Sequence, residues 1–164
     1  MWGRLIKFGL VLQVGVFLLL VSVNNLLDFD TNFAFVQHVL AMDTLSGSTA
    51  LNGRAISSPT LHLAAYGLII SAEIVAGLCC LAGALRLWRG RHLAAGYFQH
   101  AKQLAALGLA LAFSLWFFGF MVVGGEWFEM WRSPTWNGQQ AAFRFIGCVG
   151  LVLVLLMQKD DELG

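Results

Sequence analysis

The chain has 164 residues, of which 59% are hydrophobic and only 12% are charged, whereas about 25% of the residues are charged in an ordinary soluble domain. Its formal net charge of +1 provides no basic field for nucleic acid, which excludes a nucleic-acid partner. The composition predicts a single integral membrane domain over residues 1–164, whose first partner is the lipid bilayer.

Four apolar runs are long enough to cross a bilayer, whose hydrocarbon core needs about 20 mostly apolar residues per helix. Together they predict an all-α fold, a four-transmembrane-helix bundle. A signal peptide would also place Arg4 and Lys7 before an apolar run, but no small-x-small cleavage site follows, so we interpret the first run as an uncleaved span. The four predicted spans cover residues 5–27, 61–85, 104–123 and 140–157.

Lys and Arg residues are unevenly distributed between the two predicted faces. The face with both termini holds Arg4, Lys7, Arg86, Arg89, Arg91, Lys102 and Lys159, and the other face holds Arg54, Arg132 and Arg144. Basic residues favour the cytoplasmic side of a membrane protein. The distribution therefore predicts a multi-pass membrane protein with the N- and C-termini in the cytoplasm; in a bacterial cell the membrane would be the inner (plasma) membrane.

The first outward connection, residues 28–60, has a periodic apolar pattern near its start. Apolar residues fall mainly on one helical side at Phe33, Phe35, Val36, Val39, Leu40 and Met42. This spacing predicts a short amphipathic helix at the membrane interface.

The tripeptide Ser-Pro-Thr occurs twice, at residues 58–60 and 133–135. Serine at the N-cap and proline at the first helical position are typical of a helix start. We therefore expect both tripeptides to begin a span. Ala-Ala-Tyr and Ala-Ala-Phe follow a few residues later, which leaves open whether the chain is a duplicated hairpin.

Glu73 is the clearest ionisable residue inside a predicted span, where such groups are costly and mark candidate functional sites. His62, Tyr66 and Glu73 share one helical face by their spacing and should point into the bundle. If the depth of each residue in its span is counted from the preceding Ser-Pro-Thr tripeptide, Arg144 lies at a depth similar to that of Glu73. An Arg144–Glu73 ion pair is therefore reasonable. A structural pair, a proton or ion relay and a ligand-binding spot remain open for these residues.

The second outward connection, GGEWFEMWRSPTWNGQ, combines three tryptophans with several polar residues. Tryptophan rings prefer the headgroup level, which explains Trp127, Trp131 and Trp136 as an interfacial belt. The remaining polar residues predict a cluster at the outer mouth of the bundle, where a ligand or partner would bind. This cluster comprises Glu126, Glu129, Arg132, Asn137 and, from the first connection, His38.

No residue pattern predicts a metal site, a cofactor or catalysis. The three cysteines match neither a disulfide framework nor a metal spacing, and the histidines form no ligand motif. His38 and His62 leave a haem as a weaker alternative, although haem ligands in a membrane normally face each other from neighbouring spans. We therefore expect no enzyme activity.

Three separated motifs, NFAFVQHVLAMDT, RAISSPTLHLAAY and GGEWFEMWRSPTWNGQQAAFR, occur in order along the chain. In these motifs the chain resembles a family of predicted small bacterial integral membrane proteins of unknown function. The resemblance covers most of the chain and implies a four-span inner-membrane protein. It implies no catalytic or binding residues.

Three functions are compatible with these patterns. The first is a non-catalytic accessory or structural subunit that docks a membrane-protein partner, a second copy of the chain, or lipid. The second is a small proton-coupled carrier that uses Glu73 and Arg144. The third is a haem-bearing redox subunit that uses His38 and His62.

Overall fold

The computed structural model describes residues 1–47 and 50–162, and the regular structure in these residues is helical. Four helical stretches within them are long and apolar enough to cross a membrane, as the sequence predicts. They are α1 (Trp2–Leu27), α3 (Pro59–Gly90), the stretch Ala95–Trp127 and α6 (Gln139–Met157). The third stretch consists of α4 (Ala95–Ala101), α5 (Gln103–Ser114) and a π-helix, η2 (Leu115–Trp127).

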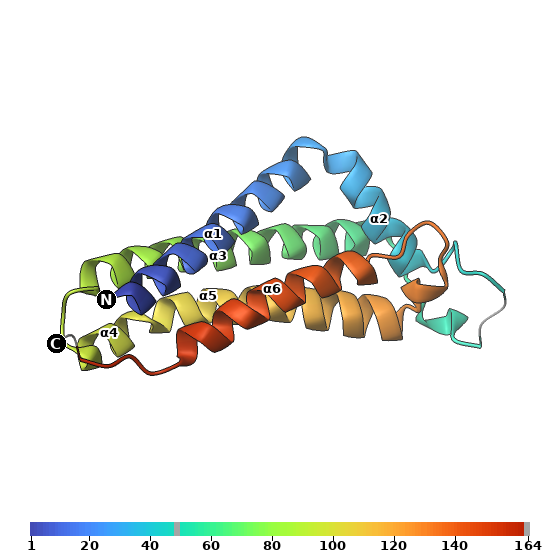
Figure 1. The fold of residues 1–164 in the computed structure, drawn as a ribbon. Coiled ribbons are helices and arrows are strands. Elements are labelled where there is room, and N and C mark those ends of the chain that lie inside the picture. Colours follow the sequence, from blue (N-terminus) through green and yellow to red (C-terminus); the bar gives the residue numbers. More distant parts are fainter. Residues whose placement is uncertain (48–49, 163–164) are drawn as a thin grey trace.

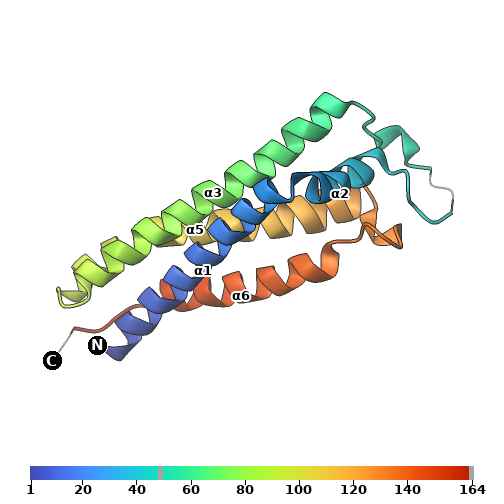
Figure 2. The same ribbon diagram turned by 90° about the horizontal axis from the view of Figure 1, so that it is seen from above.

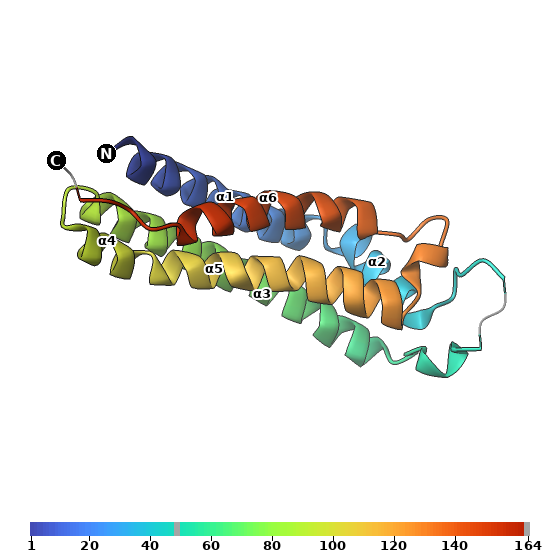
Figure 3. The ribbon, with the colours of Figure 1, turned by 60° about the horizontal axis from the view of Figure 1, so that its bottom comes forward.

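The spanning helices run up and down as a bundle (Figure 1). Helix α3 packs against both α1 and α5, and α6 packs against α5 and η2; Figures 2 and 3 show these neighbours from two further directions. Met1 and Glu162 lie at the same end, which we call the termini end, and α2 lies at the opposite end, the α2 end. An even number of spans produces this arrangement.

The predicted amphipathic helix is confirmed as α2 (Phe29–Ala41). The chain bends sharply at Asp28, where φ is −108° and ψ is 57°, and α2 folds back against the bundle (Figure 1). The rings of Phe29 and Phe33 pack against the Tyr66 ring, with centroids 4.9 and 5.8 Å apart. The apolar face of α2 is thus covered by α3 and, at Phe35, by Phe120 of η2 rather than left free on the membrane surface.

Small residues allow α3 and α5 to approach closely. A Cβ atom added to Gly83 would lie 2.5 Å from the backbone nitrogen of Ala105, and one added to Gly108 would lie 2.8 Å from the carbonyl oxygen of Ala76. Both distances are shorter than a van der Waals contact. Glycine is therefore required for this interhelical spacing.

The two Ser-Pro-Thr tripeptides have different structures. Pro59 is the first residue of α3, as predicted. The prediction for the second tripeptide is wrong, because α6 begins only at Gln139. The Ser133 hydroxyl oxygen instead accepts hydrogen bonds from the backbone N–H groups of Thr135 (3.4 Å) and Trp136 (2.9 Å), which form a local turn. The two hairpins do not begin alike, so the tripeptides do not support a duplication.

A cluster of buried cations holds the C-terminal segment at the termini end. Lys7 and Lys102 both donate to the backbone oxygen of Gln158, at 2.8 and 2.7 Å, and both form ion pairs with the Asp160 carboxylate. Arg4 donates to three backbone oxygens, those of Arg91, Leu93 and Asp161.

This cluster also changes the titration of Asp160. Burial alone would raise the pKa of its carboxyl group, but the hydrogen bonds and charges of Lys102 and Lys7 outweigh burial and lower that pKa below its usual value. The lysines of α1 and of the third span thereby anchor the segment that follows α6.

Candidate functional site

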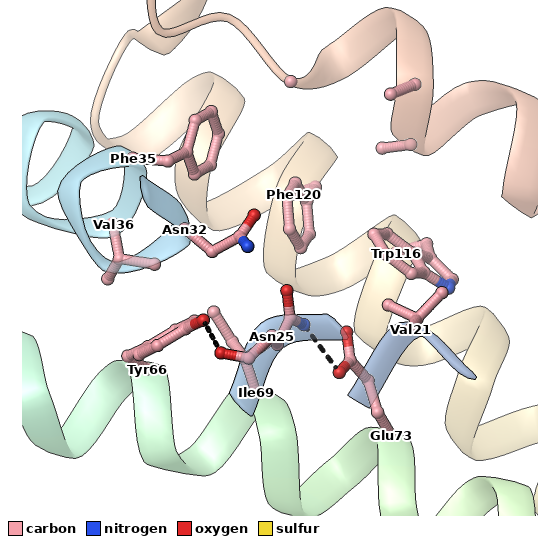
Figure 4. A pocket seen from close by; sticks show the side chains of 13 residues that line it. Val21, Asn25, Asn32, Phe35, Val36, Tyr66, Ile69, Glu73, Trp116 and Phe120 are labelled. Carbon is pink, nitrogen blue, oxygen red and sulfur yellow. Dashed lines mark hydrogen bonds between the residues drawn. The ribbon is translucent and has the colours of Figure 1, made fainter. Parts of the chain in front are cut away.

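A cavity of about 260 Å³ lies in the part of the bundle toward the α2 end. It is enclosed by the last turns of α1, by α2, α3 and η2, and by the start of α6 (Figure 4). Helix α1 diverges from α6 toward the α2 end, and α2 folds back from the end of α1 (Figure 1), so residues of all three helices line the cavity. Five of its lining residues carry polar atoms: Asn25, Asn32, Tyr66, Glu73 and Trp116.

Glu73 is the most deeply buried of these polar residues, with 1% of its surface exposed. It lies close to the middle of the 32-residue helix α3, about 21 Å along the helix from Pro59 at a rise of 1.5 Å per residue. Its Oε2 atom accepts a hydrogen bond of 2.9 Å from the amide nitrogen of Asn25 (Figure 4). The Glu73 side chain thus faces the interior of the bundle, the direction that the helical spacing predicts.

Tyr66 positions Asn25 from the same face of α3. Its hydroxyl donates a hydrogen bond of 2.8 Å to the backbone oxygen of Asn25 (Figure 4). That oxygen belongs to the last turn of α1, whose terminal carbonyl groups have no partner within the helix. Tyr66 and Glu73 therefore hold the end of α1 at two points.

His62 belongs to the same buried face but has another role. Its Nε2 atom lies 2.7 Å from the backbone oxygen of Ile56, and a carbonyl oxygen only accepts, so Nε2 carries the proton. This bond ties the preceding loop to the start of α3. His62 does not line the cavity described above.

Arg144 is not the partner of Glu73. No ion pair joins these two residues in the described part of the chain, and Arg144 is exposed on α6. The buried residues of α6 are Ala142, Val149 and Leu156, which repeat every seven residues. Arg144 follows Ala142 by two residues, which is a rotation of about 200° around the helix axis, so its side chain points away from the bundle. The expected pairing assumed a helix start at the second tripeptide, and that start was wrong.

The cavity therefore contains a carboxylate without a nearby cation. Among the described residues that line it, Glu73 is the only one with a formally charged side chain at neutral pH, and Tyr66 is the only other titratable residue. The remaining lining is apolar or uncharged. An isolated buried carboxylate is costly, and either a proton or a bound cation removes the unfavourable charge.

Most residues of the predicted outer-mouth cluster bond to other residues of the two outer connections. Glu129 and Arg132 form an ion pair of 3.2 Å, and Arg132 also donates to the backbone oxygen of Ser46 at 2.9 Å. The Asn137 side-chain oxygen accepts the N–H of Gln139 at 3.1 Å, beside the start of α6.

The predicted cluster also includes His38 and Glu126, which differ in their surroundings. The His38 ring stacks on Trp136, with centroids 4.8 Å apart, and its Nδ1 atom lies 2.9 Å from Asp43. Glu126 is exposed near the end of η2. A ring nitrogen of His38 thus bonds to Asp43, and a ring nitrogen of His62 bonds to the backbone oxygen of Ile56. The structure does not present the two histidines as a pair of ligands.

A comparison with protein-family models matches residues 3–159 to the family described as predicted small integral membrane proteins (DUF2165). The chain belongs to this family. The match extends over all four spanning stretches, and it agrees with the resemblance seen in the three sequence motifs. Neither the curated proteins nor the solved structures give a match to the chain.

In this member of the family, three cavity residues escaped the sequence analysis: Asn25, Asn32 and Trp116. Trp116 is 5% exposed, and its indole N–H has no hydrogen-bond partner in the described residues. Asn25 is uncharged and Trp116 is largely apolar, so neither residue has the high cost of an ionisable group within an apolar run. A search for every polar atom at membrane depth would have found both.

Proposed function

We propose that this protein is a small non-catalytic carrier of the membrane in which Glu73 exchanges a proton for a cation. One observation carries the proposal: a carboxylate that is 1% exposed, halfway along a spanning helix, lines a cavity with no positive side chain among its described lining residues. Carriers commonly place coupling groups near the middle of the bilayer. Arg144 has no part in this mechanism.

The irregular helix beside the cavity supports the same function. Trp116 and Phe120 reach the cavity from the π-helix η2. Long π-helical segments are rare, and shorter ones occur frequently at functional sites. The wider turn of η2 supplies a wall of the cavity that an ordinary α-helix would place differently.

We further propose that the protein lies in the bacterial inner membrane with the termini end in the cytoplasm. The excess of Lys and Arg at this end supports that orientation. A reporter that is active only in the periplasm should therefore be silent when it is fused to the C-terminus. An active reporter at this position would reverse the orientation.

Proton exchange is tested with purified protein in liposomes that enclose a pH-sensitive dye. Gradients of sodium, potassium and several organic ammonium ions are applied in turn, and the proton movement that accompanies each cation is recorded. We expect at least one cation to move protons with the native chain and none to do so with Glu73→Gln. Arg144→Gln is the matched control and should keep the native rate. No proton movement with any cation, or equal movement with Glu73→Gln, would reject the carrier.

An accessory subunit is the second candidate, and two glycines favour it. Gly67 on α3 and Gly147 on α6 are exposed, and a Cβ atom added to either would meet no atom within 4 Å. Exposed small residues on spanning helices allow a partner helix to approach closely. We expect Gly67→Leu and Gly147→Leu to release a partner that co-purifies in mild detergent. Recovery of the native chain alone, as a monomer, would count against this candidate.

A further inference from the structure

Four aromatic side chains line the cavity. Phe35 on α2, Tyr66 on α3, and Trp116 and Phe120 on η2 all line it together with Glu73 (Figure 4). The faces of aromatic rings attract cations, and they are the usual surroundings of a bound quaternary ammonium group. Aromatic rings and a carboxylate both attract positive charge, so together they suit an organic ammonium ion.

Each asparagine amide of the cavity offers an oxygen acceptor, beside the second N–H of its nitrogen. The Asn25 side-chain nitrogen donates to Glu73 at 2.9 Å, and that of Asn32 donates to the backbone oxygen of Asp28 at 3.0 Å. Each amide therefore retains its oxygen for a ligand. With the second oxygen of Glu73, the cavity offers three oxygen acceptors, which suit a positively charged or hydrogen-bond-donating group.

An apolar groove adjoins this cavity. It has a volume of about 440 Å³ and lies between α2, α3 and the stretch from α5 into η2. Four residues line both spaces: Phe35, Val36, Ile69 and Phe120. Leu68 and Phe118 at the edge of the groove are exposed on the membrane-facing surface, so the groove offers apolar substituents a route from the lipid.

We propose that the substrate of this site is a lipophilic organic ammonium ion, whose charged nitrogen lies among Glu73, Asn25 and the aromatic rings while its apolar substituents occupy the groove. This inference rests on the proposed carrier function, because it names what Glu73 exchanges for a proton. One monovalent cation enters as one proton leaves the carboxyl group, so the net charge of the site is the same before and after exchange. A small inorganic cation fits less well, since three oxygens and four aromatic rings do not replace a full hydration shell.

Direct binding tests the inference with benzyltrimethylammonium as the probe. Radiolabelled probe is added to the full chain in detergent, and saturable binding is measured at fixed pH. We expect Glu73→Gln to weaken binding at least tenfold and Trp116→Leu to weaken it about tenfold, as expected for the loss of a desolvated cation–π contact. Arg144→Gln, outside the cavity, should bind as the native chain does. Glu73→Asp keeps the charge and should retain weakened binding, which covers the case that the glutamine variant does not fold.

The results separate this inference from the carrier function on which it rests. If sodium or potassium moves protons through Glu73 while benzyltrimethylammonium neither binds nor moves protons, the carrier stands and the ammonium substrate is rejected. If the probe binds equally well to Glu73→Gln and Trp116→Leu, the cavity is not its site. If the probe binds as expected but no cation moves protons, the ammonium site stands as a binding site and the carrier fails.

Discussion

Asn25 on α1 and Glu73 on α3 are 48 positions apart in the chain and are joined by a hydrogen bond of 2.9 Å. The bond does two things at once. It fixes the end of α1 against α3, next to the bond from Tyr66 to the backbone of Asn25, and it satisfies one oxygen of a buried carboxylate. Structure and proposed function therefore depend on the same pair.

Removal of the amide should destabilise the bundle. Asn25→Ala leaves the Glu73 carboxylate without its described hydrogen-bond partner, and a buried acceptor that loses its partner costs about 1–3 kcal/mol. We expect a lower midpoint of thermal unfolding in detergent, measured by circular dichroism. Asn24→Ala is the matched control, since the Asn24 side chain is exposed one position away. Equal losses in both variants would show that the amide of Asn25 is not specifically required.

Arg144 and Glu73 should behave independently in a double-mutant cycle. Arg144 is exposed and has no ion pair with Glu73 in the described chain, and substitutions without shared partners add to within about 0.5 kcal/mol. We therefore expect the changes in free energy of unfolding caused by Arg144→Gln and by Glu73→Gln to sum to the change in the double variant. A larger coupling energy, measured by denaturant unfolding in the same detergent, would support the Arg144–Glu73 ion pair that the sequence suggested.

Close packing between α3 and α5 gives a prediction on Gly108. An added methyl group would lie 2.8 Å from both the Ala76 oxygen and the Cys80 nitrogen, and the backbone there cannot move without displacing α3. Overpacking of this kind costs about 1–3 kcal/mol. Gly108→Ala should lower the unfolding midpoint, while Gly9→Ala, with no atom within 4 Å of the added carbon, should not. A native-like midpoint for Gly108→Ala would show that the two helices have room to separate.

The features that the sequence predicted correctly depend on local periodicity. Apolar runs predict the four spans, and the spacing of His62, Tyr66 and Glu73 predicts the buried face of α3. The pattern from Phe33 to Met42 likewise predicts α2, which ends one residue earlier, at Ala41. In each case the residues that decide the structure lie within a few helical turns of one another.

The features that were missed depend on contacts between distant segments or on a choice between two local structures. Serine followed by proline suits both a helix start and a turn, and Ser133 forms the turn while Ser58 precedes a helix. The cavity arises because α2 folds back after Asp28, which no period in the sequence describes. For the same reason the partner of Glu73 is Asn25 of α1. The similar depths of Glu73 and Arg144 in their spans had suggested Arg144 of α6 instead.

Acid should release the C-terminal segment from the termini end. Lys102 and Lys7 lower the pKa of Asp160 despite its burial, so the folded carboxyl group loses its proton more readily than the unfolded one. The ion pairs therefore stabilise the folded chain fully at pH values above the unfolded pKa of about 3.9. This stabilisation is lost as the pH falls below that value and through the folded pKa.

Asp160→Asn tests this dependence, because the amide keeps the shape of the side chain without its charge. We expect the variant to unfold at a lower temperature than the native chain at pH 7, and the difference to shrink as the pH is lowered below about 4. Asp161→Asn is the matched control, because the Asp161 side chain is exposed and only its backbone oxygen accepts a hydrogen bond from Arg4. The unfolding temperature of this variant should equal that of the native chain both at pH 7 and below about pH 4. A difference between Asp160→Asn and the native chain that stays constant from pH 7 to pH 3 would show that the carboxylate charge does not hold the segment in place.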